Sequence, residues 1–104
     1  MSSNLRVLII DDHTLFRDGL KGLLDRHNID VVGSLGDGHE GIRLAQELNP
    51  DIVLLDMRMP NITGLEVLKQ LQQIKFESPV AMLTTSNDER DLVEALRNGA
   101  KGYL

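Results

Sequence analysis

The sequence contains no cysteine and no tryptophan, and its 104 residues include only one tyrosine and two phenylalanines. The absence of cysteine excludes disulfide bonds, thiolate metal sites and a cysteine nucleophile. Any metal must therefore be held by oxygen or by imidazole nitrogen. No apolar run approaches the length of about 18 residues that spans a membrane, and the N-terminal MSSNLR has no apolar signal region. We therefore expect no membrane association and a cytoplasmic location.

Positive charge is also scarce in this chain. It has 11 lysines and arginines against 16 aspartates and glutamates, which gives a net charge of −5. That sign repels a phosphate backbone, so we expect no direct nucleic-acid binding by this chain. The length fits one domain, and the 41% hydrophobic and 26% charged residues are typical of a globular protein.

Short apolar runs that do not alternate with polar residues indicate the fold class. The clearest runs lie at 7–10, 52–55 and 80–83, and segments 31–35 and 101–104 complete five expected strands. Continuous apolar strands are typical of a parallel sheet that is covered on both faces. The intervening segments carry helical spacing, at Leu15, Phe16, Leu20, Leu23 and Leu24; Ile42, Ala45 and Leu48; Leu65, Leu68 and Leu71; and Leu92, Val93 and Leu96.

The alternation of five strands with four helices predicts a doubly wound α/β domain, with the flavodoxin-like strand order 2-1-3-4-5. Helix-breaking residues fall between the expected elements, at Asn49-Pro50, Pro79 and Asn98-Gly99. The whole chain, residues 1–104, is predicted to form one domain.

Three aspartates follow expected strands: Asp11 and Asp12 after the first, and Asp56 at the end of the third. In the flavodoxin-like order these two strands are neighbours, so the three carboxylates converge at one sheet edge. Such a cluster needs either protonation of one acid or a divalent cation, and Mg²⁺ fits best because it takes a few carboxylates together with phosphate oxygens. The simpler alternative is that Asp11 and Asp12 merely cap the following helix.

The same edge could support phosphoryl transfer. A carboxylate such as that of Asp56 can attack phosphorus when a metal neutralises the developing charge. Thr84, at the end of the fourth strand, could donate its hydroxyl to a phosphoryl oxygen. The histidines, His13, His27 and His39, lack ligand spacing, so we predict structural roles for them.

The chain resembles the receiver domains of two-component response regulators, most closely the NarL/LuxR-type subfamily. The resemblance rests on four segments in the family's order and spacing, IIDDH, PDIVLLDMRMPNITGLEVL, VAMLTTSN and NGAKGYL. It implies Mg²⁺-dependent acceptance of a phosphoryl group from a sensor histidine kinase. The implied site comprises Asp56 as phosphoacceptor, Asp11, Asp12 and Asp56 with the backbone carbonyl of Arg58 as metal ligands, and Thr84 and Tyr103 as switch residues.

The resemblance also carries expectations about the whole molecule. Members of this subfamily usually have a helix-turn-helix output domain, and their receiver has a phosphate-contacting lysine and a fifth helix after the fifth strand. We therefore predict a receiver truncated before that helix, with no output domain, and with a partly bare sheet face that favours a homodimer or a domain-swapped oligomer.

Two activity classes remain open at this point. A receiver is a switch and not a turnover enzyme. The alternative is a Mg²⁺-dependent phosphohydrolase with an aspartyl-phosphate intermediate, as in haloacid-dehalogenase-like enzymes. Those enzymes place a second acid two residues after the nucleophile, whereas Asp56 is followed by Met57 and Arg58.

Overall fold

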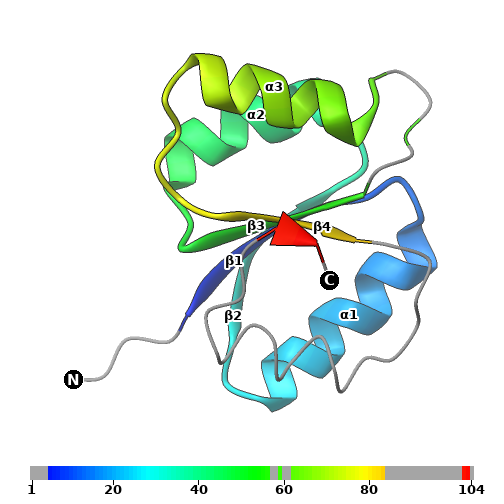
Figure 1. Ribbon diagram of the computed structural model, residues 1–104. Helices are drawn as coiled ribbons and strands as arrows, with labels where there is room; N and C mark the ends of the chain where they lie inside the picture. Colours follow the sequence, from blue (N-terminus) through cyan, green and yellow to red (C-terminus); the bar gives the residue numbers. More distant parts are fainter. Residues whose placement is uncertain (1–4, 57–58, 60–61, 84–101, 104) are drawn as a thin grey trace.

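The computed structural model describes residues 5–56, 59, 62–83 and 102–103 of the chain, and it shows strands and helices in alternation (Figure 1). In chain order the elements are β1 Arg6–Ile10, α1 Thr14–Arg26, β2 Asp30–Leu35, α2 Gly38–Leu48, β3 Ile52–Asp56, α3 Gly64–Gln73, β4 Val80–Leu83 and β5 Gly102–Tyr103. The expected helix around Leu92, Val93 and Leu96 lies outside the described residues.

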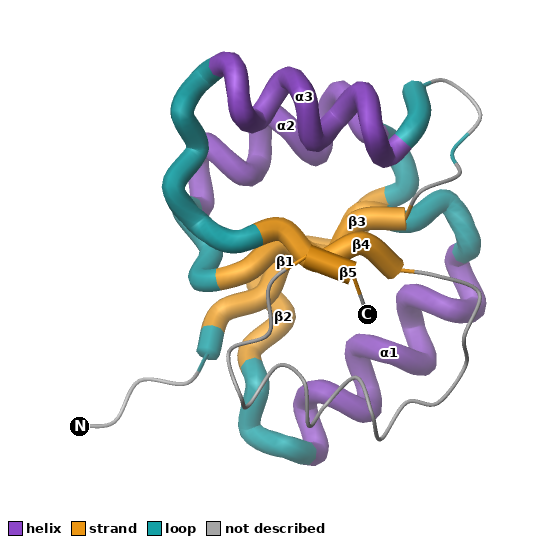
Figure 2. The backbone as a smooth tube through the Cα atoms, in the orientation of Figure 1, coloured by secondary structure: helices purple, strands orange, loops and turns teal. Residues whose placement is uncertain are grey.

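The five strands form one parallel sheet in the order β2-β1-β3-β4-β5, as the sequence predicts. Figure 2 shows β5 beside β4 at one edge of this sheet. In the centre, Ile10 of β1 is paired with Leu55 of β3. Asp11 and Asp56, the residues that follow this pair, therefore lie at the same edge of the sheet.

The helices cover the sheet from both sides, with α1 on one face and α2 and α3 on the other (Figure 1). This division follows from right-handed crossovers on either side of the first strand. None of the helices in the described part of the chain combines the length and apolarity needed to cross a membrane.

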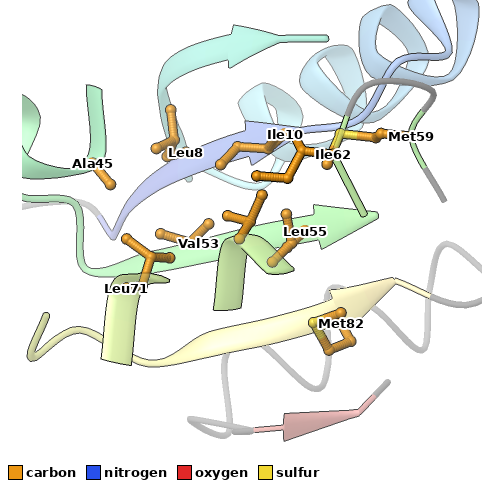
Figure 3. Close-up of a cluster of buried hydrophobic side chains, with 10 residues drawn as sticks. Leu8, Ile10, Ala45, Val53, Leu55, Met59, Ile62, Leu71 and Met82 are labelled. Atoms are coloured by element: carbon orange, nitrogen blue, oxygen red, sulfur yellow. The ribbon is translucent and has the colours of Figure 1, made fainter. Parts of the chain in front are cut away.

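Each central strand supplies two hydrophobic cores, because successive side chains point to opposite faces. Val7 and Ile9 pack with Leu20, Leu23 and Leu24 of α1. Figure 3 shows the other core, where Leu8 and Ile10 of β1 and Val53 and Leu55 of β3 point toward the α2 and α3 side. Met59 and Ile62, from the connection that follows β3, are also buried in this second core. The unbroken apolar runs of the sequence are thus explained by burial on both faces.

Local side-chain signals set the ends of α2 and α3. Asp37 caps α2 by accepting a hydrogen bond from the backbone N–H of His39 at 3.0 Å. Thr63 caps α3 by accepting from the backbone N–H of Glu66 at 3.2 Å. At the other end of α2, Asn49 adopts the left-handed conformation with φ 47° and precedes Pro50, which stops the helix as predicted.

The structure corrects two of the expected core positions. Leu15 of α1 is 88% exposed and Leu65 of α3 is 45% exposed, although both were assigned to apolar helix faces. Leu15 lies about 100° around the helix from its neighbour Phe16, which packs against the first core, so the two cannot share that face. In α3 the expected Leu71 is buried and the expected Leu68 packs against the second core, whereas Val67, which was not among the expected positions, is also buried.

Candidate metal and phosphoacceptor site

Three aspartates meet at the carboxyl edge of the sheet. Asp11 follows β1 directly, and Asp56 is the last residue of the neighbouring strand β3. One ligand atom from each of Asp11, Asp12, Asp56 and His13 lies within 4.8 Å of all the others. The convergence of the three acids that strand order predicts is therefore present, and an imidazole joins them.

Asp11 is buried and held in place from several directions. Its exposed fraction is 4%, and its backbone N–H donates to the carbonyl of Leu35 on β2 at 3.0 Å. Its carboxylate Oδ1 accepts a hydrogen bond from the backbone N–H of His13 at 2.8 Å. Arg17 of α1 reaches back and donates from Nη1 to the Asp11 carbonyl at 2.7 Å. The position of this carboxylate is thus set by β2, α1 and its own loop.

Asp12 has a carboxylate oxygen, Oδ1, that lies 3.3 Å from His13 Nδ1 without accepting a hydrogen bond from it. Its Oδ1 atom is buried and accepts no hydrogen bond in the described part of the chain. A buried carboxylate oxygen without such a bond is costly, and a cation is one of the few groups that would compensate it. The donor set is also suitable, because three carboxylate oxygens are hard ligands of the kind Mg²⁺ prefers. The residues present therefore fit a magnesium ion.

The helix-capping alternative does not explain these acids. The N-cap of α1 is His13, no side chain makes a cap hydrogen bond there, and the helix begins at Thr14. Asp11 and Asp12 precede that position, and the Asp11 carboxylate accepts from the N-cap residue itself rather than from the first turn. At α2 and α3, by contrast, true capping bonds are formed. Side-chain capping of α1 therefore does not account for the two acids.

His13, for which the sequence predicts a structural role, lies with its imidazole close to the three acids. Its Nδ1 atom lies 2.9 Å from Asp11 Oδ1, 3.3 Å from Asp12 Oδ1 and 3.7 Å from Asp56 Oδ2. The hydrogen bond to Asp11, followed by the negative charge of Asp12, raises the pKa of the His13 imidazole above its usual value. No spacing pattern marks this histidine, and the only available signal was its position directly after the paired acids.

Asp56 belongs to the acidic cluster, and its side chain is also partly exposed to solvent. Its side chain is 15% exposed at the end of β3, compared with 5% for the side chain of Asp11. The side chain of Asp56 is thus more exposed than that of Asp11, although its Oδ2 atom is buried.

The remaining predicted site residues cannot be placed in the same way. Arg58 and Thr84 lie outside the described residues. Tyr103 belongs to β5, which pairs with β4, but its side chain also lies outside the described part. Their suggested roles stay predictions.

Residues 7–104 match the family model of the response regulator receiver domain. The chain belongs to the response regulator receiver family. Its relatives include the transcriptional regulatory protein YdfI of Bacillus subtilis, 43% identical over 95% of this chain and 46% of that protein. The nitrate/nitrite response regulator NarL of Escherichia coli K12 is also 43% identical, over 94% of this chain and 46% of that protein. The chain thus spans about half the length of these curated relatives and is of the NarL/LuxR type.

Solved receiver structures agree with the fold. A two-component response regulator of the LuxR family from Aurantimonas matches with a TM-score of 0.77 and 30% identity, over 97% of this chain and 73% of that one. The response regulator domain of Thermotoga maritima CheB matches with a TM-score of 0.76 and 36% identity, over 97% and 77% of the two chains. The doubly wound receiver fold is therefore shared with proteins of known structure.

Proposed function

We propose that this receiver domain accepts a phosphoryl group on Asp56 from the phosphohistidine of a sensor histidine kinase, with Mg²⁺ held by Asp11, Asp12 and Asp56. The backbone carbonyl of Arg58 is proposed as a further ligand. The observation that carries this proposal is the meeting of the three carboxylates at the ends of the neighbouring strands β1 and β3, within 4.8 Å of one another.

The proposed transfer is a direct displacement at phosphorus. A carboxylate oxygen of Asp56 forms the new O–P bond while the P–N bond of the phosphohistidine breaks, and the released imidazole takes a proton from water. Bound Mg²⁺ would supply positive charge that offsets the negative charge of the phosphoryl oxygens. Asp11, fixed by Leu35 and Arg17, keeps its carboxylate beside Asp56 during this step.

The outcome of the transfer is the phosphorylated domain itself, which acts as the switched form of the protein, and not a small molecule that is released. We propose that the new charge at Asp56 draws in the Thr84 hydroxyl and lets Tyr103 turn inward, which shifts an existing conformational equilibrium near β5. Water later removes the phosphoryl group. In the full-length cytoplasmic protein this shift would control a DNA-binding transcriptional output, which is supported by the relatives described as transcriptional regulatory proteins.

Intact mass spectrometry distinguishes this function from its alternatives. The protein would be incubated with acetyl phosphate and Mg²⁺, with a chelator-treated sample as control, while orthophosphate release is measured. A persistent single phosphoryl adduct that needs Mg²⁺ is the expected result. Orthophosphate release at many turnovers would indicate a phosphohydrolase instead, and the absence of both adduct and turnover would contradict any phosphoryl chemistry at this site.

A further inference from the structure

We propose that His13 is a fourth protein ligand of this site, through Nδ1, for a borderline divalent transition-metal ion such as Ni²⁺ or Zn²⁺. The site would then bind such an ion more tightly than it binds Mg²⁺. This inference rests on the proposed function, because the same three carboxylates are proposed to hold Mg²⁺.

The first support is the position of one nitrogen atom. His13 Nδ1 lies 2.9, 3.3 and 3.7 Å from carboxylate oxygens of Asp11, Asp12 and Asp56, respectively. Neighbouring ligands that are each about 2.1 Å from one metal ion lie about 3.0–3.4 Å apart in octahedral or tetrahedral sites. The Nδ1 atom therefore stands at a ligand's spacing from the carboxylates, and small movements would complete the shell.

The second support is that the ring faces the acids through its hydrogen bond with Asp11 Oδ1 and not through packing in a hydrophobic core. The His13 side chain is 68% exposed and belongs to neither hydrophobic core in the described part of the chain. As the N-cap residue of α1, it makes no side-chain cap hydrogen bond. Its backbone N–H is tied to Asp11 Oδ1 at 2.8 Å, which fixes the start of the side chain above the cluster. The ring is thus held toward the acids, while its outer side remains open to water, where Nε2 can keep its proton.

The third support is the chemistry of the donor set. Three carboxylate oxygens alone favour hard ions such as Mg²⁺ or Mn²⁺. One imidazole nitrogen added to them gives a mixed nitrogen and oxygen site, which suits Zn²⁺, Ni²⁺ and Co²⁺, and affinity for such sites rises along the series from Mn²⁺ toward Cu²⁺. Mg²⁺ gains nothing from the nitrogen. His13 would therefore change which ion the site prefers, while the ion would still bind at the same place between the three aspartates.

Calorimetric titration with NiCl₂ and with MgCl₂ tests this role. The chain would carry no polyhistidine tag, and the variants would be His13→Ala, the matched control His39→Ala and Asp12→Ala. His39 is exposed and lies outside the cluster. We expect His13→Ala to weaken Ni²⁺ binding at least about tenfold, since even the loss of a group that only supports a ligand costs that much. Its Mg²⁺ affinity should not fall, because Mg²⁺ gains nothing from the nitrogen, and His39→Ala should change the affinity for neither ion.

A structural readout accompanies the affinities. Addition of Zn²⁺ should shift the ring resonances of His13 in the NMR spectrum, whereas those of His39 should stay in place. Addition of Mg²⁺ should not produce the shift of the His13 or His39 ring resonances that direct coordination by the imidazole causes. Unchanged His13 resonances in the presence of bound Zn²⁺ would overturn the inference, as would equal Ni²⁺ affinity in wild type and His13→Ala.

The Asp12→Ala variant separates this inference from the proposed function. This variant should lose binding of both Ni²⁺ and Mg²⁺. If it loses Mg²⁺ while His13→Ala keeps full Ni²⁺ affinity, only the role of His13 is wrong. If it retains Mg²⁺ binding, the magnesium site of the proposed function is wrong and the inference that rests on it falls as well.

Discussion

At the scale of single residues, Asp12 is the clearest test of the cation site. Its buried Oδ1 lacks a hydrogen bond in the described part of the chain, so Asp12→Ala should weaken Mg²⁺ binding by about tenfold or more. The same change should raise the stability of the metal-free protein, because it removes one of three like charges. Calorimetry and denaturant unfolding measure the two effects, with Asp18→Ala, an exposed site on α1, as control. Equal Mg²⁺ affinity in Asp12→Ala and wild type would contradict the site.

His13 gives the metal-free protein a pH-dependent stability. The Asp11 hydrogen bond and the Asp12 charge raise the folded-state pKa of His13 above its usual value of 6.5. The folded state then holds the proton more tightly, so the stabilisation is complete below pH 6.5 and is lost as the pH rises through the folded pKa. With a chelator present to remove metal ions, the difference in unfolding free energy between wild type and His13→Ala should shrink as the pH rises from 6.5 through the folded-state pKa of His13. A difference that grows with pH would contradict the ion-pair geometry.

The site residues differ in how far the sequence could predict them. Asp11, Asp12 and Asp56 were predictable because strand ends in a parallel sheet share one edge, and strand order places β1 beside β3. His13 was not predictable, because its approach depends on the loop that turns its ring back over the acids. A side-chain direction of that kind is set by backbone geometry and not by residue spacing.

At the scale of elements, close contact between α2 and β1 depends on Gly41. A Cβ atom at this position would lie 2.5 Å from Cδ1 of the buried Ile10, whereas a Cβ at Gly19 of α1 would meet nothing within 4 Å. Gly41→Ala should therefore destabilise the fold by about 1–3 kcal/mol through overpacking. Gly19→Ala should instead stabilise it by about 0.5–1 kcal/mol, because alanine is the better helix former. Denaturant unfolding of both variants measures this, and stabilisation by both would contradict the packing described.

The elements themselves were largely predictable from burial. Apolar runs without alternation identified the central strands, and capping residues such as Asp37 and Thr63 are visible in the sequence. The orientation of each helix was less predictable. Leu15 and Leu65 satisfy helical spacing but point away from the cores, because a helix can carry apolar residues beyond the face that it buries.

At the scale of the whole molecule, self-association stays a prediction from the sequence. We expect the 104-residue polypeptide to form a homodimer or a domain-swapped oligomer. Light scattering over a range of concentrations measures this, together with the melting temperature, which should rise with protein concentration if folding and association are coupled. A monomer at high concentration with a concentration-independent melting temperature would contradict the expectation.

The central claim is that the acidic edge of this receiver domain is a phosphoacceptor site with Asp56 as its nucleophile. Intact mass spectrometry after treatment with acetyl phosphate and Mg²⁺, applied to wild type and Asp56→Asn in parallel, tests it most directly. We predict one phosphoryl group on the wild type and none of comparable stability on the variant, which should fold normally because the amide has the same shape but cannot form the acyl phosphate. A phosphoryl adduct on Asp56→Asn as stable as that of the wild type would show that Asp56 is not the acceptor.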